Sequence, residues 1–134
     1  DAVILPGGFG VAKNLSDFAI SGPNCSVQAD VLAALQGFAS AHKPVGLICI
    51  APTLAAKIFG AGVNCTIGTD HETAAAVEQM GAIHNECLVE DIVVDEQHKL
   101  VTTPAYMLAH SISEAASGIN KLVDRVLELI PKQA

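Results

Sequence analysis

Positive charge is scarce in this sequence, and the scarcity excludes two classes of partner. The 134 residues include seven Lys and Arg against fourteen Asp and Glu, for a net charge of −7. Binding to nucleic acid by phosphate neutralisation needs clustered cations, and the sequence contains no such cluster. Anionic membrane surfaces also attract basic segments. We therefore predict no nucleic-acid partner and no membrane partner.

Long apolar runs and paired cysteines are also missing. The longest apolar stretch, residues 45–56, is interrupted by Pro52 and is shorter than the roughly 20 residues that span a bilayer. The four cysteines form no CxxC pair and match no zinc spacing (Cys25, Cys49, Cys65 and Cys87). Scattered single thiols favour a reducing compartment over secretion. We expect a protein of the cytoplasm or the mitochondrial matrix, with no metal and no cofactor.

Charged residues of both signs are few, and apolar residues are many. Charged residues make up 16% of the chain and hydrophobic residues 51%, whereas charged residues usually supply about 25%. Much of the chain is therefore expected to be buried, in a doubly covered sheet or in a subunit interface. The length predicts a single domain over residues 1–134. Because Asp1 leads directly into an apolar run, and native domains rarely begin inside a buried strand, we expect a fragment of a longer protein.

Short apolar runs alternate with helical patterns, which is typical of βαβ units and a mostly parallel sheet. Strands are predicted at 1–5, 45–48, 64–67 and 82–87, and a hairpin at 91–95 and 99–102. Helices are predicted at 11–18, 27–42, 51–59, 72–80 and 107–129, with Ser26 capping the second of them. The fold class is therefore α/β.

Three segments should meet at the carboxyl ends of the strands, where α/β sheets bind ligands. They are Gly7-Gly8, Cys49 and residues 102–105, which include Thr103 and Pro104. Cys49 follows a strand and precedes a helix, the geometry of a nucleophile elbow, and the positive end of that helix favours thiolate. Because free cysteines are often buried, a structural thiol is the alternative.

For each group that could assist Cys49 in catalysis, the sequence also allows a purely structural role. Backbone N–H groups of the Gly7-Gly8 turn, together with the N–H of Ile50, could form an oxyanion hole, although a simple turn explains the glycines equally well. His71, in the run Asp70-His71-Glu72, is the best imidazole candidate. The alternative is that Asp70 caps the next helix and His71 is solvated. His71, His84, Glu86 and Cys87 match no standard metal site.

Several motifs in order resemble the PfpI-type branch of the class I glutamine amidotransferase-like superfamily. They are LPGGFG (5–10), GLICIAP (46–52), TIGTD (66–70), DIVVD (91–95) and VTTPAYM (101–107). Within that branch they are most similar to the ElbB-type proteins of isoprenoid biosynthesis, which are glyoxalase-like and have mitochondrial animal relatives. The resemblance covers nearly the whole chain.

The resemblance implies a flavodoxin-like three-layer sandwich with a mostly parallel sheet, lacking its first βα region, and usually a homodimer. It implies that Cys49 is the nucleophile and that Gly8 and Ile50 face the oxyanion, with Gly7, Asp70, Thr103 and Pro104 around the substrate pocket. The implied activity is lyase or hydrolase chemistry on small reactive carbonyls such as glyoxal. The alternatives are a non-catalytic redox-sensing or scaffold member, or a truncated product that self-associates.

The sequence departs from the family pattern where histidines are expected. Ile50 follows the cysteine where many relatives have His, and Gly68 stands where another branch places one. Residues 103–107 contain neither the His nor the carboxylate that a glutaminase triad needs, so we predict no complete glutaminase. A glutamate that the family brings from an N-terminal segment is not in this chain.

Overall fold

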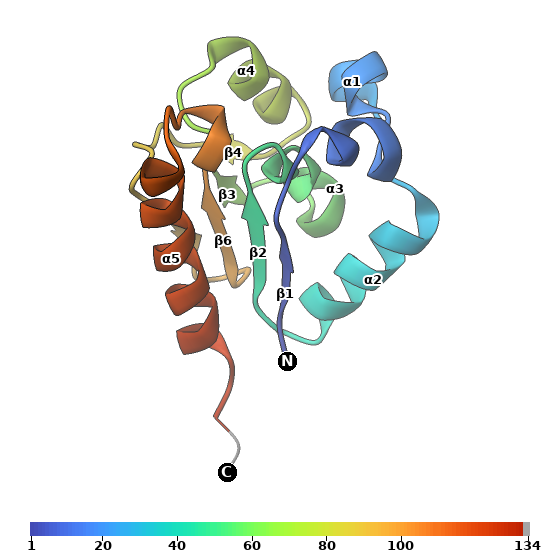
Figure 1. The fold of residues 1–134 in the computed structure, drawn as a ribbon. Coiled ribbons are helices and arrows are strands. Elements are labelled where there is room, and N and C mark those ends of the chain that lie inside the picture. The colour runs from blue at the N-terminus through green and yellow to red at the C-terminus, as the bar shows by residue number, and fades with distance from the viewer. Residues whose placement is uncertain (133–134) are drawn as a thin grey trace.

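The centre of the fold is a four-stranded sheet in the order β1-β2-β6-β5 (Figure 1). The structure is a computed structural model that describes residues 1–132. The strands are β1 (Val3–Leu5), β2 (Val45–Ile48), β6 (Leu100–Thr103) and β5 (Val93–Asp95). The first three are parallel, and β5 pairs antiparallel with β6. This confirms the predicted mostly parallel sheet and the hairpin.

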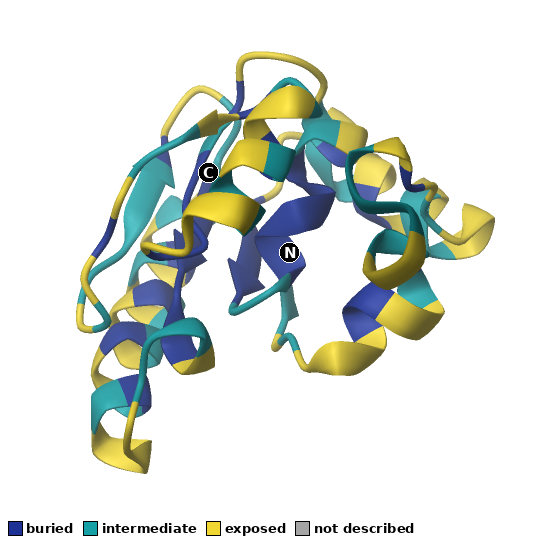
Figure 2. Cartoon of the chain, turned by 90° about the horizontal axis from the view of Figure 1, so that it is seen from above, coloured by how far each residue is buried: buried dark blue, intermediate teal, exposed yellow. Residues whose placement is uncertain are grey.

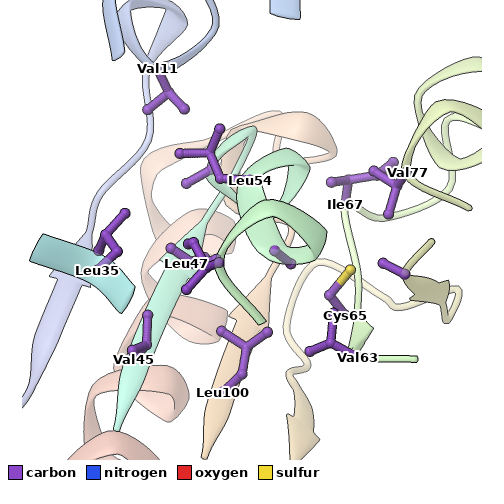
Figure 3. Packing of buried hydrophobic residues seen from close by; sticks show 14 residues of the cluster. Val11, Leu35, Val45, Leu47, Leu54, Val63, Cys65, Ile67, Val77 and Leu100 are labelled. Carbon is purple, nitrogen blue, oxygen red and sulfur yellow. The ribbon is translucent and has the colours of Figure 1, made fainter. Parts of the chain in front are cut away.

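Helices cover both faces of this sheet, which makes the three layers of the predicted sandwich. Along β2, Val45 and Leu47 belong to a cluster with the helices α2 (Ala29–Ser40) and α3 (Ala55–Phe59), as Figure 3 shows. Ile48 belongs to a second cluster with α5 (Ile112–Leu129). Alternate residues of a strand point to opposite faces of the sheet. An apolar run without polar alternation therefore packs against the helices on both faces.

Helix α5 packs closely against β2 at a position where the strand carries a glycine, Gly46. A Cβ built at Gly46 would lie 2.9 Å from the Leu122 side chain and 3.2 Å from that of Val126. The side chains of Leu122 and Val126 are both almost completely buried. The glycine therefore sets the distance between this helix and the strand that ends at Cys49.

A second, two-stranded sheet lies beside β5 and is joined to it by one carboxylate. It consists of β3 (Asn64–Cys65) and β4 (Ile83–His84), which are parallel. The buried Asp95 of β5 accepts hydrogen bonds from the Asn64 N–H (2.8 Å) and the His98 N–H (3.0 Å), and lies 2.9 Å from the His98 ring. Burial raises the pKa of Asp95, but these hydrogen bonds outweigh it, so the pKa is lowered overall.

Helix boundaries depart most from prediction where tertiary contacts compete with the local pattern. The helix predicted at 27–42 begins at Ala29 and is capped by Gln28, not by Ser26. The backbone N–H of Ser26 is bound to the Asp17 carboxylate at 2.7 Å, and Val27 pairs with Ser16 in a β-bridge. The chain is therefore still extended where the pattern predicts a helix.

The other elements are shorter or more broken than predicted. The helix predicted at 11–18 is a π-helical turn, η1 (Val11–Leu15), followed by α1 (Phe18–Ser21) and a 3₁₀ turn, η2 (Gly22–Asn24). The last helix begins at Ile112, capped by Ser111, because a 3₁₀ turn, η4 (Ala105–Met107), comes first. The helix α4 (His71–Gln79) is close to prediction.

Burial follows these layers, as the view from above in Figure 2 shows: the central strands are buried and the outer turns of the helices are exposed. The edge strand β1 is only half-buried throughout. Within residues 1–132, no helix combines the length and the apolarity needed to cross a membrane.

Candidate functional site

Cys49 lies at a sharp backbone turn directly after β2. Its φ is +65°, in the left-handed region that residues with a Cβ avoid at a cost of roughly 1–2 kcal/mol. The turn is held by a hydrogen bond from the Cys49 N–H to the Thr103 carbonyl at 3.0 Å, which continues the β2–β6 ladder. Strained non-glycine residues of this kind cluster at functional sites. The geometry is that of the predicted elbow.

The turn after β1 is pressed against this elbow at Gly7. A Cβ built there would lie 2.6 Å from the Ile48 carbonyl oxygen and 2.9 Å from the Cβ of Cys49, and φ at Gly7 is +91°. Any other residue would meet both a steric and a conformational obstacle. Gly7 thus brings together the glycine turn and the cysteine, each of which follows the carboxyl end of a strand.

The two predicted oxyanion donors are the residues that directly follow Gly7 and Cys49 in the sequence. Gly8 follows Gly7 with φ +89° and is exposed, and Ile50 follows Cys49 and is half-buried. Ile50 leads into a 3₁₀ turn, η3 (Ala51–Leu54), in which its carbonyl accepts hydrogen bonds from Thr53. Within residues 1–132, the N–H groups of Gly8 and Ile50 donate no hydrogen bond to the protein. Their role as donors stays a prediction.

The end of β6 supports the elbow from the other side. Thr103 is completely buried, and its hydroxyl donates to the Asp91 carbonyl at 2.7 Å while its own carbonyl accepts from Cys49. Pro104 is buried and opens η4. Because the hydroxyl and the carbonyl of Thr103 already form hydrogen bonds within the protein, Thr103 contributes to the site by holding Cys49 in place.

Gly68 has no space for the histidine that one related branch places there. Its φ is +102°, and a Cβ would lie 3.0 Å from the Leu108 side chain and 3.2 Å from that of Pro104. A larger side chain would have to displace both neighbours. The missing imidazole is therefore consistent with close local packing.

Asp70 and His71 lie at the start of α4. Asp70 accepts hydrogen bonds from the Thr73 hydroxyl and from the Thr73 N–H, which lower its pKa and make it the N-cap of α4. The alternative interpretation of Asp70 as a cap is thus confirmed. His71 is exposed and lines a cavity of about 290 Å³ with Glu78, His84 and Glu86.

This cavity is not lined by Cys49, so the structure does not place His71 against the thiol. Its pairing with Cys49 stays a prediction. His84, in the same cavity, accepts a hydrogen bond from the Ile67 N–H at its Nε2 atom (3.1 Å). Among the described residues, no group of three or more acidic, His or Cys side chains gathers closely enough to hold a metal ion.

A larger, mostly apolar cavity was not predicted from the sequence. It has a volume of about 540 Å³ and lies between the segment η1–α1–η2 and α4. Its walls include Phe9, which follows Gly8, and Ile50, which follows Cys49. The available signal was the presence of two large apolar residues, Phe9 and Ile20, outside the predicted strands and helices.

The remaining cysteines differ from Cys49 in exposure. Cys25, Cys65 and Cys87 are buried and Cys49 is half-buried, and all four are free. Burial raises the pKa of Cys65 to about 12 and, with help from Asp91 and Glu90, that of Cys87 to about 11. Burial also raises the pKa of Cys25. These three are structural thiols by position.

Three curated mitochondrial proteins match 98% of the chain. The ES1 protein homolog of Rattus norvegicus and the glutamine amidotransferase-like class 1 domain-containing protein 3 of Homo sapiens are each 45% identical to it. The ES1 protein of Danio rerio is 33% identical. The chain spans about half the length of these relatives, 53%, 52% and 54% respectively. No family model matches the chain.

Two solved structures share the fold. An isoprenoid biosynthesis protein with an amidotransferase-like domain from Ehrlichia chaffeensis is 27% identical, with a TM-score of 0.85 over 96% of this chain and 59% of its own. Drosophila melanogaster DJ-1beta is 20% identical, with a TM-score of 0.56 over 96% of this chain and 60% of its own, and supports the fold alone. Both agree with the amidotransferase-like α/β architecture that the motifs implied.

Proposed function

We propose that this chain, a homologue of the glutamine amidotransferase-like class 1 domain proteins, uses Cys49 as a nucleophile toward small reactive carbonyl compounds. The observation that carries the proposal is the left-handed turn at Cys49, at the carboxyl end of β2 and in contact with the glycine turn after β1. Reactive thiols need partial exposure, and Cys49 is the half-buried one of the four cysteines.

The chemistry can be written for glyoxal without an external oxidant. The Cys49 thiolate adds to one aldehyde carbon, a C–S bond forms, and the carbonyl electron pair becomes an oxyanion that the N–H groups of Gly8 and Ile50 would hold. The hydrogen on that carbon then moves, as a proton through an enediol, to the neighbouring carbon, which leaves a thioester. Water cleaves the thioester and releases glycolate and the free thiol, so one carbon is oxidised and the other reduced.

A group that carries the protons is also part of the proposal. His71 is the imidazole candidate from the sequence, and a carboxylate outside this chain is the alternative that the family resemblance implies. General acid–base catalysis of this kind contributes about 10²- to 10⁴-fold to a rate.

We also propose that the active protein is a homodimer in the mitochondrial matrix. The location is supported by the mitochondrial relatives.

The test compares glycolate formation from glyoxal by the wild-type chain and by Cys49→Ser. We expect the rate to fall by about 100-fold or more, because the nucleophile is removed. Cys87→Ala is the control, because Cys87 is buried and lies outside the elbow. This variant should convert glyoxal at the wild-type rate. Equal rates for wild type and Cys49→Ser would refute the proposal.

The redox-sensing alternative has a separate signature. It is favoured by the same difference in exposure, because oxidants reach accessible thiols first. A peroxide adduct at Cys49, found by mass spectrometry in a chain that converts no carbonyl compound, would support that alternative over the enzyme.

A further inference from the structure

We infer that Gly118, inside α5, is a positioning residue for the Cys49 thiol and acts through the buried hydroxyl of Thr103. The inference rests on the proposed function, because it names what holds the proposed nucleophile in its left-handed turn. It derives from the close approach of α5 to the end of β6, the strand that binds the Cys49 N–H.

Gly118 is required by space and not by backbone conformation. It is buried within the 18-residue helix α5 and has an ordinary helical conformation, where glycine is a poor residue. A Cβ at this position would lie 2.6 Å from the Thr103 hydroxyl oxygen and closer still to the Val89 carbonyl oxygen. The missing side chain thus lets α5 lie directly against the end of β6 and the segment before β5.

The end of β6 is fixed by a short chain of hydrogen bonds beside Gly118. The Thr103 hydroxyl donates to the Asp91 carbonyl at 2.7 Å, and the Thr103 carbonyl accepts from the Cys49 N–H at 3.0 Å. One turn further along α5, the Lys121 Nζ atom lies 3.1 Å from the Asp91 carboxylate. Helix α5 therefore contacts both partners of the Thr103 hydroxyl bond.

The thiol lies on the same side of the sheet as this helix. Cys49 packs against the buried cluster that includes Leu122 and Val126 of α5. The cost of its left-handed turn is similar in size to the contribution of one hydrogen bond, so the turn depends on its bond to Thr103. A shift of α5 against β6 would loosen that bond and withdraw the thiol from the exposed position that an elbow provides.

The test compares Gly118→Ala with Gly37→Ala, the same change at an exposed glycine of α2 whose Cβ would meet nothing within 4 Å. We expect iodoacetamide to label Cys49 about tenfold more slowly in Gly118→Ala, the equivalent of about one hydrogen bond, and at the wild-type rate in Gly37→Ala. The buried Cys65 is the internal reference, because a general loosening of the fold would speed the labelling of both thiols.

Two variants of Thr103 keep the test decisive if Gly118→Ala folds poorly. Thr103→Val retains the shape of the side chain and removes the hydroxyl, so Cys49 labelling should again slow by about tenfold. Thr103→Ser keeps the hydroxyl and should slow labelling less. The double variant of Gly118→Ala and Thr103→Val should be no slower than Thr103→Val alone, because both changes act on one hydrogen bond. Wild-type labelling in Thr103→Val, equal effects of Val and Ser, or additive effects in the double variant would overturn the inference.

Turnover separates this inference from the proposed function. In Gly118→Ala, kcat for glyoxal should fall by about 10²-fold with little change in KM, since a small misplacement of the reacting groups can cost that much. If Cys49→Ser abolishes conversion while Gly118→Ala and Thr103→Val keep wild-type turnover and labelling, the positioning role fails and the proposed function stands. If Cys49→Ser converts glyoxal at the wild-type rate, the proposed function fails, and Cys49 labelling alone decides whether α5 positions the thiol.

Discussion

A methyl group added at Gly7 should destabilise the fold much more than one added at Gly8. Both residues have φ near +90°, so each alanine incurs the left-handed cost of roughly 1–2 kcal/mol. Only at Gly7 would the new Cβ also meet other atoms, at 2.6 Å from the Ile48 carbonyl and 2.9 Å from the Cβ of Cys49. Nothing lies within 4 Å of a Cβ at Gly8.

The difference between the two variants isolates the contact with the elbow. Overpacking against backbone costs about 1–3 kcal/mol, so we expect Gly7→Ala to lower the free energy of unfolding by about 2–5 kcal/mol and Gly8→Ala by about 1–2 kcal/mol. A loss of that size is a large part of the roughly 5–15 kcal/mol that stabilises a typical domain. Urea unfolding monitored by circular dichroism measures both values.

The same pair reports on the position of the thiol. Gly7→Ala must move either the glycine turn or the elbow, so alkylation of Cys49 by iodoacetamide should change its rate, whereas in Gly8→Ala the rate should stay close to that of the wild type. Equal free energies of unfolding for the two variants would refute the conclusion that the first turn is pressed onto the elbow.

Two more predictions follow from burial. In the native chain, iodoacetamide should label Cys49 before the three buried cysteines, whose pKa values are raised by burial, and mass spectrometry after a short exposure should show this order; simultaneous labelling in the folded chain would contradict it. Burial lowers the pKa of His84 although Glu78 and Glu86 oppose it. The stability contributed by neutral His84 is therefore complete above about pH 6.5 and is lost as the pH falls below it. His84→Gln, whose amide oxygen can still accept from Ile67, should flatten this dependence in urea titrations, and an unchanged slope would contradict the assignment.

The fold class and the elbow were predictable because their signals are local. The apolar run before Cys49 has no polar alternation, as expected for a strand covered on both faces, and the structure places it at the centre of the sheet. Asp70 precedes a helical pattern and does cap α4. In both cases the residues that decide the structure are within a few positions of one another.

The rest was not predictable because it depends on contacts between distant segments. Ser26 has a good capping side chain, but its backbone is bound to Asp17 and the helix begins later. The strand predicted at 64–67 pairs with β4 in a separate sheet, and the carboxylate of Asp95 joins it to the hairpin. The apolar cavity arises only when η1, α1 and η2 lie against α4.

The elbow and the cavity are built from different parts of the molecule. The backbone of Cys49 belongs to the ladder between β2 and β6, which is among the most buried parts of the fold. The cavity walls include exposed side chains such as Phe9 and Ile20, and substitutions at exposed positions usually change stability by less than about 0.5 kcal/mol.

This separation has an evolutionary consequence. Mutations at exposed wall positions can reshape the cavity at little risk to folding, while a side chain added at Gly7 would disturb the geometry of the thiol. Selection can therefore alter the cavity without rebuilding the elbow, and laboratory evolution of this scaffold would best begin with randomised libraries at positions such as Phe9, Ile20 and Ala76.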